Sequence, residues 1–288
     1  MGRSLFDSSD AARAIFEQAD GILGYAVSTV CFEGPEDRLQ ETHHAQPALF
    51  VTSIACLEAA RERDVLSESP PAFVAGHSLG EYTALHAAGA LTFEDGLRLV
   101  QERGRLMQEA ADQQAGTMAA LLGLEEDAVE AVCKETGTEV CNLNAPGQIV
   151  IGGAESAVEA AMALALERGA RRSLRLKVGG AFHTSFMQPA VEGMERAVAE
   201  TPFADASPPV VANTTAKPLT DAAALREELV RQLAEPVQWQ RSITYLAAQG
   251  VDSVVEFGPG RVLTGLVRRI DRSLSTRNIS GTADLEPA

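Results

Sequence analysis

The stretch Gly76-His77-Ser78-Leu79-Gly80 constrains the fold of this chain more than any other. A short apolar run, residues 72–75, follows two prolines and predicts a buried strand, and residues 79–88 predict a helix. At such a strand-to-helix turn the flanking glycines leave room for strained backbone, and the serine hydroxyl stands above the sheet. The start of the following helix offers free N–H groups to a developing oxyanion. So short a motif often occurs by chance, but the strand before it and the helix after it favour Ser78 as a nucleophile.

Length and charge limit the classes of protein that this chain can form. A chain of 288 residues is long for one compact core, so we expect one large domain with an insertion or a second lobe. The net charge of −16 argues against nucleic acid as a partner. The sequence shows no membrane-spanning run and no secretion leader, which predicts a cytoplasmic protein, and we expect a monomer. The four cysteines lack C-x-x-C spacing and are expected to be reduced core residues, with no metal site.

The middle of the chain follows a β-α-β-β-α-β pattern, which is typical of a ferredoxin-like unit. The expected strands are residues 118–122, 139–143, 148–151 and 173–178, and the expected helices are residues 125–136 and 155–167. We therefore predict an α/β protein in which a hydrolase-like parallel-sheet lobe, residues 1–115 and 181–288, carries an inserted ferredoxin-like lobe, residues 116–180.

Two helices of the large lobe carry polar residues that could reach Ser78. An apolar helix is expected to begin at Gln46-Pro47, with the proline in its first turn and Gln46 near the site. A second helix begins after Thr92 and runs to about residue 111. Arg103 lies in it, and an arginine there is ordinarily a solvated surface charge. The polar tail from Ser273 is expected to fray.

A serine nucleophile needs a base within hydrogen-bond reach. The histidines available are His43, His44, His77, His86 and His183. His43 and His44 are expected in a loop, and His77 should point to the other side of the turn. His183 follows a glycine-rich junction between the lobes, where its side chain can enter the cleft, and we select it. In ordinary α/β-hydrolases the histidine follows an acidic residue and lies near the C-terminus, so this order disfavours an esterase or lipase.

A cluster of basic residues stands out in this acidic chain. It comprises Arg168, Arg171, Arg172, Arg175 and Lys177. A solvated helix end is the ordinary interpretation of such a cluster, and a docking face for an acidic partner is the more specific one.

The sequence resembles the malonyl-CoA:acyl-carrier-protein transacylases and the related acyltransferases of polyketide synthases, above all the free-standing, trans-acting ones. The resemblance covers nearly the whole chain. The motifs that carry it are Gln46-Pro47-Ala48-Leu49, Gly76-His77-Ser78-Leu79-Gly80-Glu81-Tyr82, Gln101-Glu102-Arg103-Gly104, Asn142-Leu143-Asn144-Ala145-Pro146-Gly147-Gln148, Ala181-Phe182-His183, Arg231-Gln232-Leu233, Pro236-Val237-Gln238-Trp239 and Gly258-Pro259-Gly260.

The resemblance implies a transfer reaction with Ser78 at its centre. Ser78 would take an acyl group from malonyl-CoA and pass it to the phosphopantetheine thiol of an acyl carrier protein, in fatty-acid or polyketide synthesis. His183 would be the base, held by the main-chain carbonyl of Gln232 in place of a carboxylate. The N–H of Leu79 would contact the oxyanion. No cofactor is implied, since the phosphopantetheine belongs to the partner.

The same resemblance implies how the substrate is selected. Arg103 would clamp the free carboxylate of a dicarboxylic acyl chain, which is a bidentate task that lysine cannot copy. Phe182 would fill the space beside the acyl α-carbon, so a branched chain should clash. Gln46 and Asn144 are the other substrate-binding residues that the matching motifs imply.

The family pattern also has an N-terminal strand and a Gly-Gln-Gly-Ser-Gln loop, whose glutamine supplies a second oxyanion contact. Met1-Gly2 matches the part of the pattern after that loop, so we expect strand and loop to be absent from this sequence and its activity and stability to be reduced. If the chain is fully active without that strand and loop, another residue, with Gln46 as the candidate, must complete the oxyanion site. Two alternatives to a malonyl transferase remain. A hydrolase that clears stalled acyl carriers lacks the clamp arginine in the family pattern, and a catalytically weak carrier-binding relative would fit the missing loop.

Overall fold

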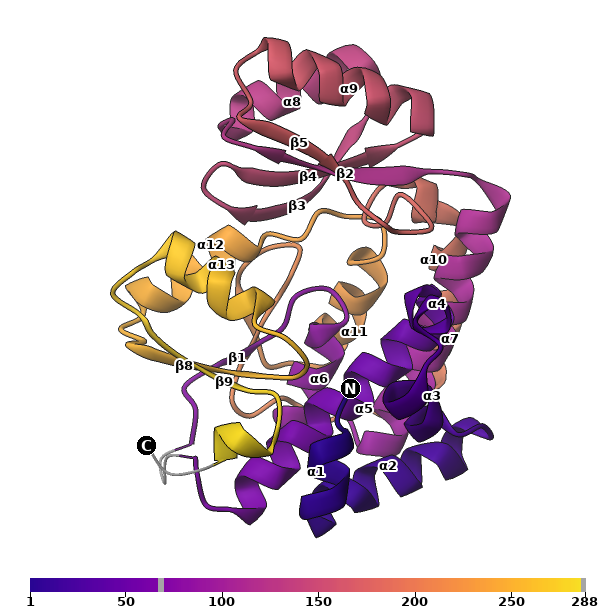
Figure 1. The fold of residues 1–288 in the computed structure, drawn as a ribbon, viewed down its shortest axis with the longest axis vertical. Coiled ribbons are helices and arrows are strands. Elements are labelled where there is room, and N and C mark those ends of the chain that lie inside the picture. The colour runs from indigo at the N-terminus through magenta and orange to yellow at the C-terminus, as the bar shows by residue number, and fades with distance from the viewer. Residues whose placement is uncertain (67–69, 286–288) are drawn as a thin grey trace.

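The computed structural model describes residues 1–66 and 70–285, and Figure 1 shows a small α/β lobe above a larger, mainly helical one. The small lobe contains a four-stranded antiparallel sheet in the order β3-β4-β2-β5. Its strands are β2 (Thr117–Leu122), β3 (Glu139–Ala145), β4 (Gln148–Gly153) and β5 (Arg172–Arg175). Helices α8 (Glu126–Thr136) and α9 (Glu155–Glu167) cover one face of it in Figure 1. This is the predicted ferredoxin-like order, with element limits that shift by a few residues.

The two faces of the small sheet have different neighbours. On one face, apolar side chains form a core with α8 and α9 that includes Leu121, Val129, Ile149 and Val158. On the other face, Met118, Ala120, Cys141 and Val150 form a separate cluster, and Phe182 packs against it. Phe182 also contacts the core of the large lobe. This side chain therefore joins the two lobes.

The sheets of the large lobe are short. Strand β1 (Val74–Ala75) pairs in parallel with β6 (Val210–Val211), and β7 (Pro218–Leu219) pairs antiparallel with β6. Strand β8 (Ser253–Phe257) pairs in parallel with β9 (Ser275–Ile279).

The expectation that the tail from Ser273 frays is wrong for residues 273–285, because the chain there forms β9, and residues 286–288 lie outside the part that the structure describes. Leu274 and Ile279, which flank the polar residues of that strand, are both buried. The residues between them lack the apolar alternation that would have indicated a strand, and the edge of β8 supplies the hydrogen-bond partners.

Helices make up most of the large lobe. They are α1 (Arg3–Ser8), α2 (Asp10–Leu23), α3 (Val27–Glu33), α4 (Glu36–Gln40), α5 (Thr42–Glu62), α6 (Gly80–Ala87), α7 (Phe93–Gln113), α10 (Gln188–Glu200), α11 (Ala222–Arg231), α12 (Trp239–Ala248) and α13 (Val262–Ile270), with 3-10 turns η1 (Ser185–Met187) and η2 (Thr282–Leu285). Among the residues that the structure describes, no helix has the length and apolar character needed to cross a membrane.

Helices α5 and α7 pack closely because α7 has glycines where they meet. A Cβ atom at Gly96 would lie 2.8 Å from the ring of Phe50, and one at Gly104 would lie 3.0 Å from Cα of His43. Both contacts are too short for an alanine without a shift of the neighbour. The close approach places Arg103, the residue before Gly104, beside the first turns of α5.

Helix α5 begins one turn earlier than the sequence predicts. The carbonyl of Glu41 accepts hydrogen bonds from the N–H groups of His44 and Ala45, at 2.9 and 2.8 Å. His43 and His44 are therefore helical and do not lie in a loop. Pro47 falls inside the helix. Pro47 removes the hydrogen bond that its own N–H would donate, but the N–H groups of the residues before it remain free to form a turn that bonds to Glu41.

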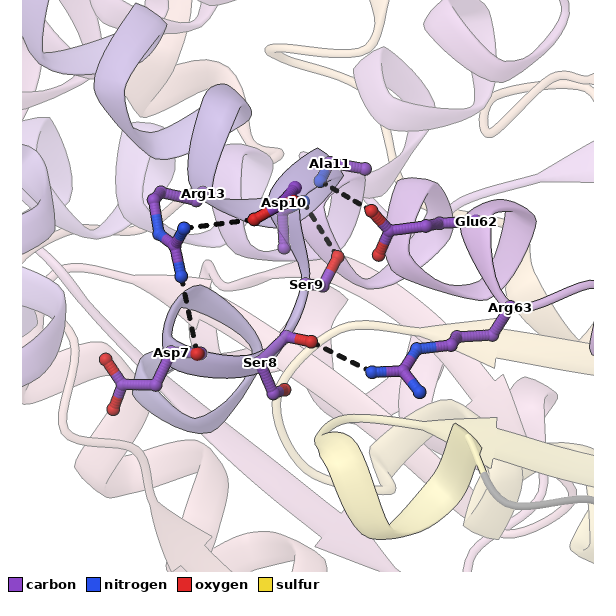
Figure 2. Close-up of polar contacts among 9 residues, drawn as sticks. Asp7, Ser8, Ser9, Asp10, Ala11, Arg13, Glu62 and Arg63 are labelled. Atoms are coloured by element: carbon purple, nitrogen blue, oxygen red, sulfur yellow. Dashed lines mark hydrogen bonds and ion pairs between the residues drawn. The ribbon is translucent and has the colours of Figure 1, made fainter.

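Hydrogen bonds connect the N-terminal helices α1 and α2 to the end of α5, as Figure 2 shows. The side chain of Ser9 caps α2 by accepting a hydrogen bond from the N–H of Ala12 at 3.0 Å. The carboxylate of Glu62 accepts from the N–H of Ala11 at 3.1 Å, and Arg63 donates to the carbonyl of Ser8 at 2.9 Å. These contacts satisfy groups that the ends of α1 and α2 leave without helical partners.

The four cysteines Cys31, Cys56, Cys133 and Cys141 are free and buried, as predicted. Burial raises the pKa of Cys31 to about 11 and that of Cys56 to about 12. Both are therefore thiols near neutral pH and behave as apolar core residues.

Candidate active site

The turn between β1 and α6 is tight and places Ser78 at its tip. A Cβ atom on Gly76 would lie 1.9 Å from the carbonyl oxygen of Gly80, so only glycine fits there. Ser78 itself has a φ of 51°, a left-handed conformation that costs a non-glycine residue about 1–3 kcal/mol. Its N–H donates to Oδ1 of Asn213 at 2.7 Å, and its carbonyl accepts from Nε2 of Gln232 at 2.9 Å. Long-range hydrogen bonds thus hold the strained turn.

Ser78 and His183 form a hydrogen-bonded pair. Oγ of Ser78 lies 2.7 Å from Nε2 of His183, and Nδ1 of His183 lies 2.6 Å from the main-chain oxygen of Gln232. Because a carbonyl can only accept, Nδ1 carries the proton and Nε2 is free to take one from the serine.

The imidazole of His183 is held in its neutral form. Burial, and then the positive charge of Arg103, lower the pKa of His183 to about 3. His183 is 4% exposed, so little water reaches its ring. Near neutral pH it is therefore unprotonated and able to accept a proton from Ser78.

Arg103 lies beside this pair and is 1% exposed, so the sequence-based interpretation as a surface charge is wrong. Its Nη1 donates to Oε1 of Gln46 at 2.6 Å. Its Nη2 donates to Oε1 of Gln232 at 2.7 Å and to Oγ of Ser78 at 3.1 Å. Burial lowers the pKa of Arg103, although a guanidinium stays charged in proteins. The guanidinium is held by neutral oxygens, and no carboxylate within the described residues lies at ion-pair distance from it. A buried cation of this kind is costly and favours binding of an anion.

The side chain of Gln232 connects several parts of the site. Besides accepting from Arg103, it donates through Nε2 to the carbonyl of Ser78 and to Oε2 of Glu81 at 2.7 Å. Its main-chain oxygen holds His183. The sequence pointed only to that main-chain oxygen, because nothing local indicates where an amide so distant in the chain from Ser78 and Arg103 will point.

Glu81, in the first turn of α6, is a buried carboxylate that the sequence reasoning did not single out. It is 1% exposed and accepts from the N–H of Asn213 at 3.0 Å as well as from Gln232. Burial, and then the nearby carboxylate of Glu228, raise the pKa of Glu81 well above its usual range. Asn213 in turn donates to the carbonyl of Gly76 at 2.7 Å. Glu81 therefore supports both ends of the serine turn and the amide that contacts Arg103.

The structure places the other expected site residues around this centre. Oδ1 of Asn144 lies 2.8 Å from Nε2 of His77, so Asn144 contacts the residue before the serine. Gln46 also donates through Nε2 to the sulfur of Met107 at 3.4 Å, and both ends of its amide are engaged. The N–H of Leu79 makes no hydrogen bond within residues 1–66 and 70–285, and it remains available to an oxygen of a substrate.

The basic cluster of the small lobe is partly neutralised. Arg168 pairs with Glu135, and Arg175 pairs with Glu155 and, at 3.5 Å, with Glu159. Arg171 and Arg172 are exposed and have no ion-pair partner in the described part of the chain.

An α/β lobe with a serine at a strand-to-helix turn, joined to a ferredoxin-like lobe, defines the class of acyltransferases, and residues 1–283 match the acyl transferase domain family. The malonyl CoA-acyl carrier protein transacylase of Bacillus subtilis is 42% identical over 293 residues, which cover 100% of this chain and 91% of the relative. The enzyme of the same name from Salmonella typhimurium is 41% identical and covers 95% of this chain and 89% of its own. The chain belongs to the malonyl CoA-acyl carrier protein transacylase family, as the motifs predicted.

Solved structures agree with this assignment. The acyl-carrier-protein S-malonyltransferase of Bartonella henselae superposes with a TM-score of 0.94 at 38% identity, covering 99% of this chain and 92% of that one. A malonyl-transacylase solved in complex with its type II polyketide synthase acyl carrier protein gives the same TM-score and identity, over 99% of this chain and 93% of that one. The fold class predicted from the sequence is thus confirmed, whereas lobe limits at residues 116 and 180 stay a prediction.

Proposed function

We propose that this enzyme transfers a malonyl group from malonyl-CoA, through an ester on Ser78, to the phosphopantetheine thiol of an acyl carrier protein. The observation that carries the proposal is Arg103, a buried cation without a carboxylate partner in the described residues, whose Nη2 lies 3.1 Å from Oγ of Ser78. An acyl group that itself ends in a carboxylate would supply the missing anion at the place where the ester forms. The names of the relatives support the same substrates.

In the first half-reaction Ser78 becomes acylated. Nε2 of His183 takes the hydroxyl proton while Oγ attacks the thioester carbon of malonyl-CoA. The N–H of Leu79 donates to the oxyanion that develops. When the tetrahedral intermediate collapses, the carbon–sulfur bond breaks, and the departing CoA sulfur takes the proton from His183. The products are the malonyl ester of Ser78 and free CoA.

The second half-reaction runs the same steps in the opposite sense. The thiol of the carrier's phosphopantetheine gives its proton to His183 and attacks the ester carbonyl, and Oγ of Ser78 leaves with that proton. The main-chain oxygen of Gln232 keeps the imidazole oriented throughout by accepting from Nδ1. No cofactor takes part in this scheme, and a cytoplasmic location is proposed with it.

The neighbours of Arg103 set the geometry of its contact with the substrate. Gln46 and Gln232 hold the guanidinium from two sides with neutral oxygens, which leaves its charge for the malonyl carboxylate. Phe182, packed between the lobes, is proposed to limit the room beside the acyl α-carbon. Asn144 acts on the site through His77 in this proposal, since it contacts that side chain.

The small lobe offers a docking surface for the carrier. Within the cluster of Arg168, Arg171, Arg172 and Arg175, the two arginines without an ion-pair partner in the described chain, Arg171 and Arg172, are proposed to contact acidic groups of the carrier. Charges at the edge of an interface act mainly on the association rate, so the contact should weaken with added salt.

The experiment that tests this function follows labelled malonyl groups through both half-reactions. The enzyme is incubated with labelled malonyl-CoA, the label is mapped to a peptide, and an acyl carrier protein bearing phosphopantetheine is then added. We expect label on Ser78 and then on the carrier, and no label on Ser78→Ala. Release of free malonate in place of transfer would indicate a hydrolase, and equal labelling of Ser78→Ala would remove Ser78 from the mechanism.

A further inference from the structure

A second group of side chains capable of ligand chemistry lies at the start of α5. Glu41, His43 and His44 each present one donor atom, and these atoms all lie within 4.8 Å of one another. Oε2 of Glu41 is 3.3 Å from Nδ1 of His44 and 3.6 Å from Nε2 of His43. The two imidazole rings have centroids 4.0 Å apart. None of these side chains takes part in the acyl transfer described above.

The donor types and spacings fit a transition-metal ion. Zinc binds imidazole nitrogen and carboxylate oxygen at about 2.0–2.2 Å, so neighbouring ligands of a tetrahedral ion lie about 3.3 Å apart. The two separations from Glu41, 3.3 and 3.6 Å, are close to that value. Two imidazoles and a carboxylate favour zinc, cobalt or nickel over calcium or magnesium, which prefer oxygen ligands.

Neighbouring residues position the two histidines, and part of the site is open to water. The backbone of His43 packs against Gly104 of α7, and the ring of His44 lies with its centroid 5.6 Å from that of Tyr25. The His43 and Glu41 side chains are 40% and 53% exposed, so water can reach their donor atoms, whereas Nδ1 of His44 is buried. Three protein ligands with a water-filled position are typical of an open metal site.

Arg38 occupies the far side of the His44 ring. Its Nε donates to Nε2 of His44 at 3.0 Å, which leaves the ring proton on Nδ1. Nδ1 is the nitrogen that faces Glu41. A metal bound there requires the proton to move to Nε2, where the N–H of Arg38 would oppose it. Arg38 therefore competes with the metal, and it is exposed and free to move aside.

We propose that Glu41, His43 and His44 form a binding site for a divalent transition-metal ion, separate from the Ser78 centre. The ion would be held by Oε2 of Glu41, Nε2 of His43 and Nδ1 of His44, with water completing the coordination. Binding displaces the Nδ1 proton of His44 to Nε2 and breaks the hydrogen bond from Arg38.

Cobalt is a suitable probe because its visible absorption depends on its ligands. The full chain is titrated with Co²⁺, and Zn²⁺ is then added in competition. We expect one equivalent to bind, with an affinity that falls about tenfold or more in Glu41→Gln, His43→Ala and His44→Ala, since even the outer partners of a metal ligand are worth that much. His86→Gln is the matched control, because His86 lies outside the cluster, and it should bind as the wild type does.

Arg38→Ala distinguishes this site from loose surface binding. It removes the competing hydrogen bond, so it should bind cobalt more tightly than the wild type. The circular dichroism of each variant reports whether α5 is intact. Failure of the wild type to bind, unchanged binding in both histidine variants with folded protein, or weaker binding in Arg38→Ala would overturn the proposal.

Discussion

Arg103 donates a 2.7 Å hydrogen bond to the side-chain oxygen of Gln232, the residue whose main-chain oxygen accepts from His183. One residue thus orients both the proposed base and the proposed carboxylate clamp. Glu81, which accepts from the other end of the same amide, is too deeply buried to exchange this contact for water. A shift of Gln232 would therefore affect the acyl group and the imidazole together.

Replacing Gln232 with alanine tests the role of its side chain separately from that of its carbonyl. The main-chain contact to His183 survives in Gln232→Ala, but Arg103 and Glu81 each lose a partner. An unsatisfied buried group costs about 1–3 kcal/mol, so we expect a lower unfolding free energy and a higher KM for malonyl-CoA. Steady-state kinetics and urea unfolding measure both. Gln249→Ala, at an exposed amide, is the control, and equal behaviour of the two variants would contradict this role.

The pH dependence of the rate reports the state of His183. Its pKa is lowered from 6.5 to about 3, so the neutral base persists as the pH falls below 6.5. We expect kcat/KM for malonyl transfer to stay nearly constant between about pH 7 and pH 5, where an ordinary histidine would become protonated. The contribution of His183 to folded stability, in contrast, should decrease over this range, because its imidazole takes up a proton near 6.5 in the unfolded chain and stays neutral in the folded one. An inflection of kcat/KM near 6.5 with the enzyme still folded would show that the imidazole titrates normally.

Two glycine-to-alanine changes compare a required glycine with a replaceable one. In Gly76→Ala the new Cβ atom would lie 1.9 Å from the backbone oxygen of Gly80, so the serine turn cannot form unchanged. We expect a loss of stability of about 3 kcal/mol or more, together with loss of transfer. Gly21 lies within α2 and has nothing within 4 Å of its Cβ position, so Gly21→Ala should stabilise by about 0.5–1 kcal/mol. The denaturant midpoints of both variants test this prediction. A Gly76→Ala variant as stable as the wild type would mean that the turn can relax.

Features that depend on residues close together in the chain could be predicted from the sequence. The glycines around Ser78 indicate the turn, and the alternation of short strands and helices after residue 116 indicates the ferredoxin-like lobe. Strand β9 is not indicated locally because β8, a distant partner, supplies its hydrogen bonds. The first turn of α5 is missed because Pro47 is typical of a helix start, whereas the N–H groups of residues before it already bond to Glu41. The burial of Arg103 depends on the packing of α7 against α5, and from the residues alone it was interpreted as a surface charge. Only the family resemblance indicated its importance.

Contacts between residues far apart in the chain were not predictable in this way. Glu81 and Gln232 are separated by 151 positions, and Ser78 and Asn213 by 135. Nothing in the local pattern of either pair shows that they meet. These contacts hold the strained serine turn and the amide beside Arg103. The sequence therefore indicated the reacting residues of the site more fully than the hydrogen bonds that hold those residues in place.

The ratio of malonyl to acetyl transfer in Arg103→Ala tests the central claim most directly. Acetyl-CoA has the same thioester but no terminal carboxylate. The rate of acetyl transfer therefore depends on Ser78 and His183 but not on a contact between a carboxylate and Arg103. Removing one partner of a buried charge pair costs about 2–5 kcal/mol. We therefore expect kcat/KM for malonyl-CoA to fall by the factor that corresponds to this rise in activation free energy, while acetyl transfer changes little or improves. Arg103→Lys should recover only part of the loss, because an ammonium cannot bind a carboxylate through two N–H groups. An equal loss for malonyl and acetyl transfer would contradict the account, because Arg103 would then support the fold of the site without selecting the acyl group.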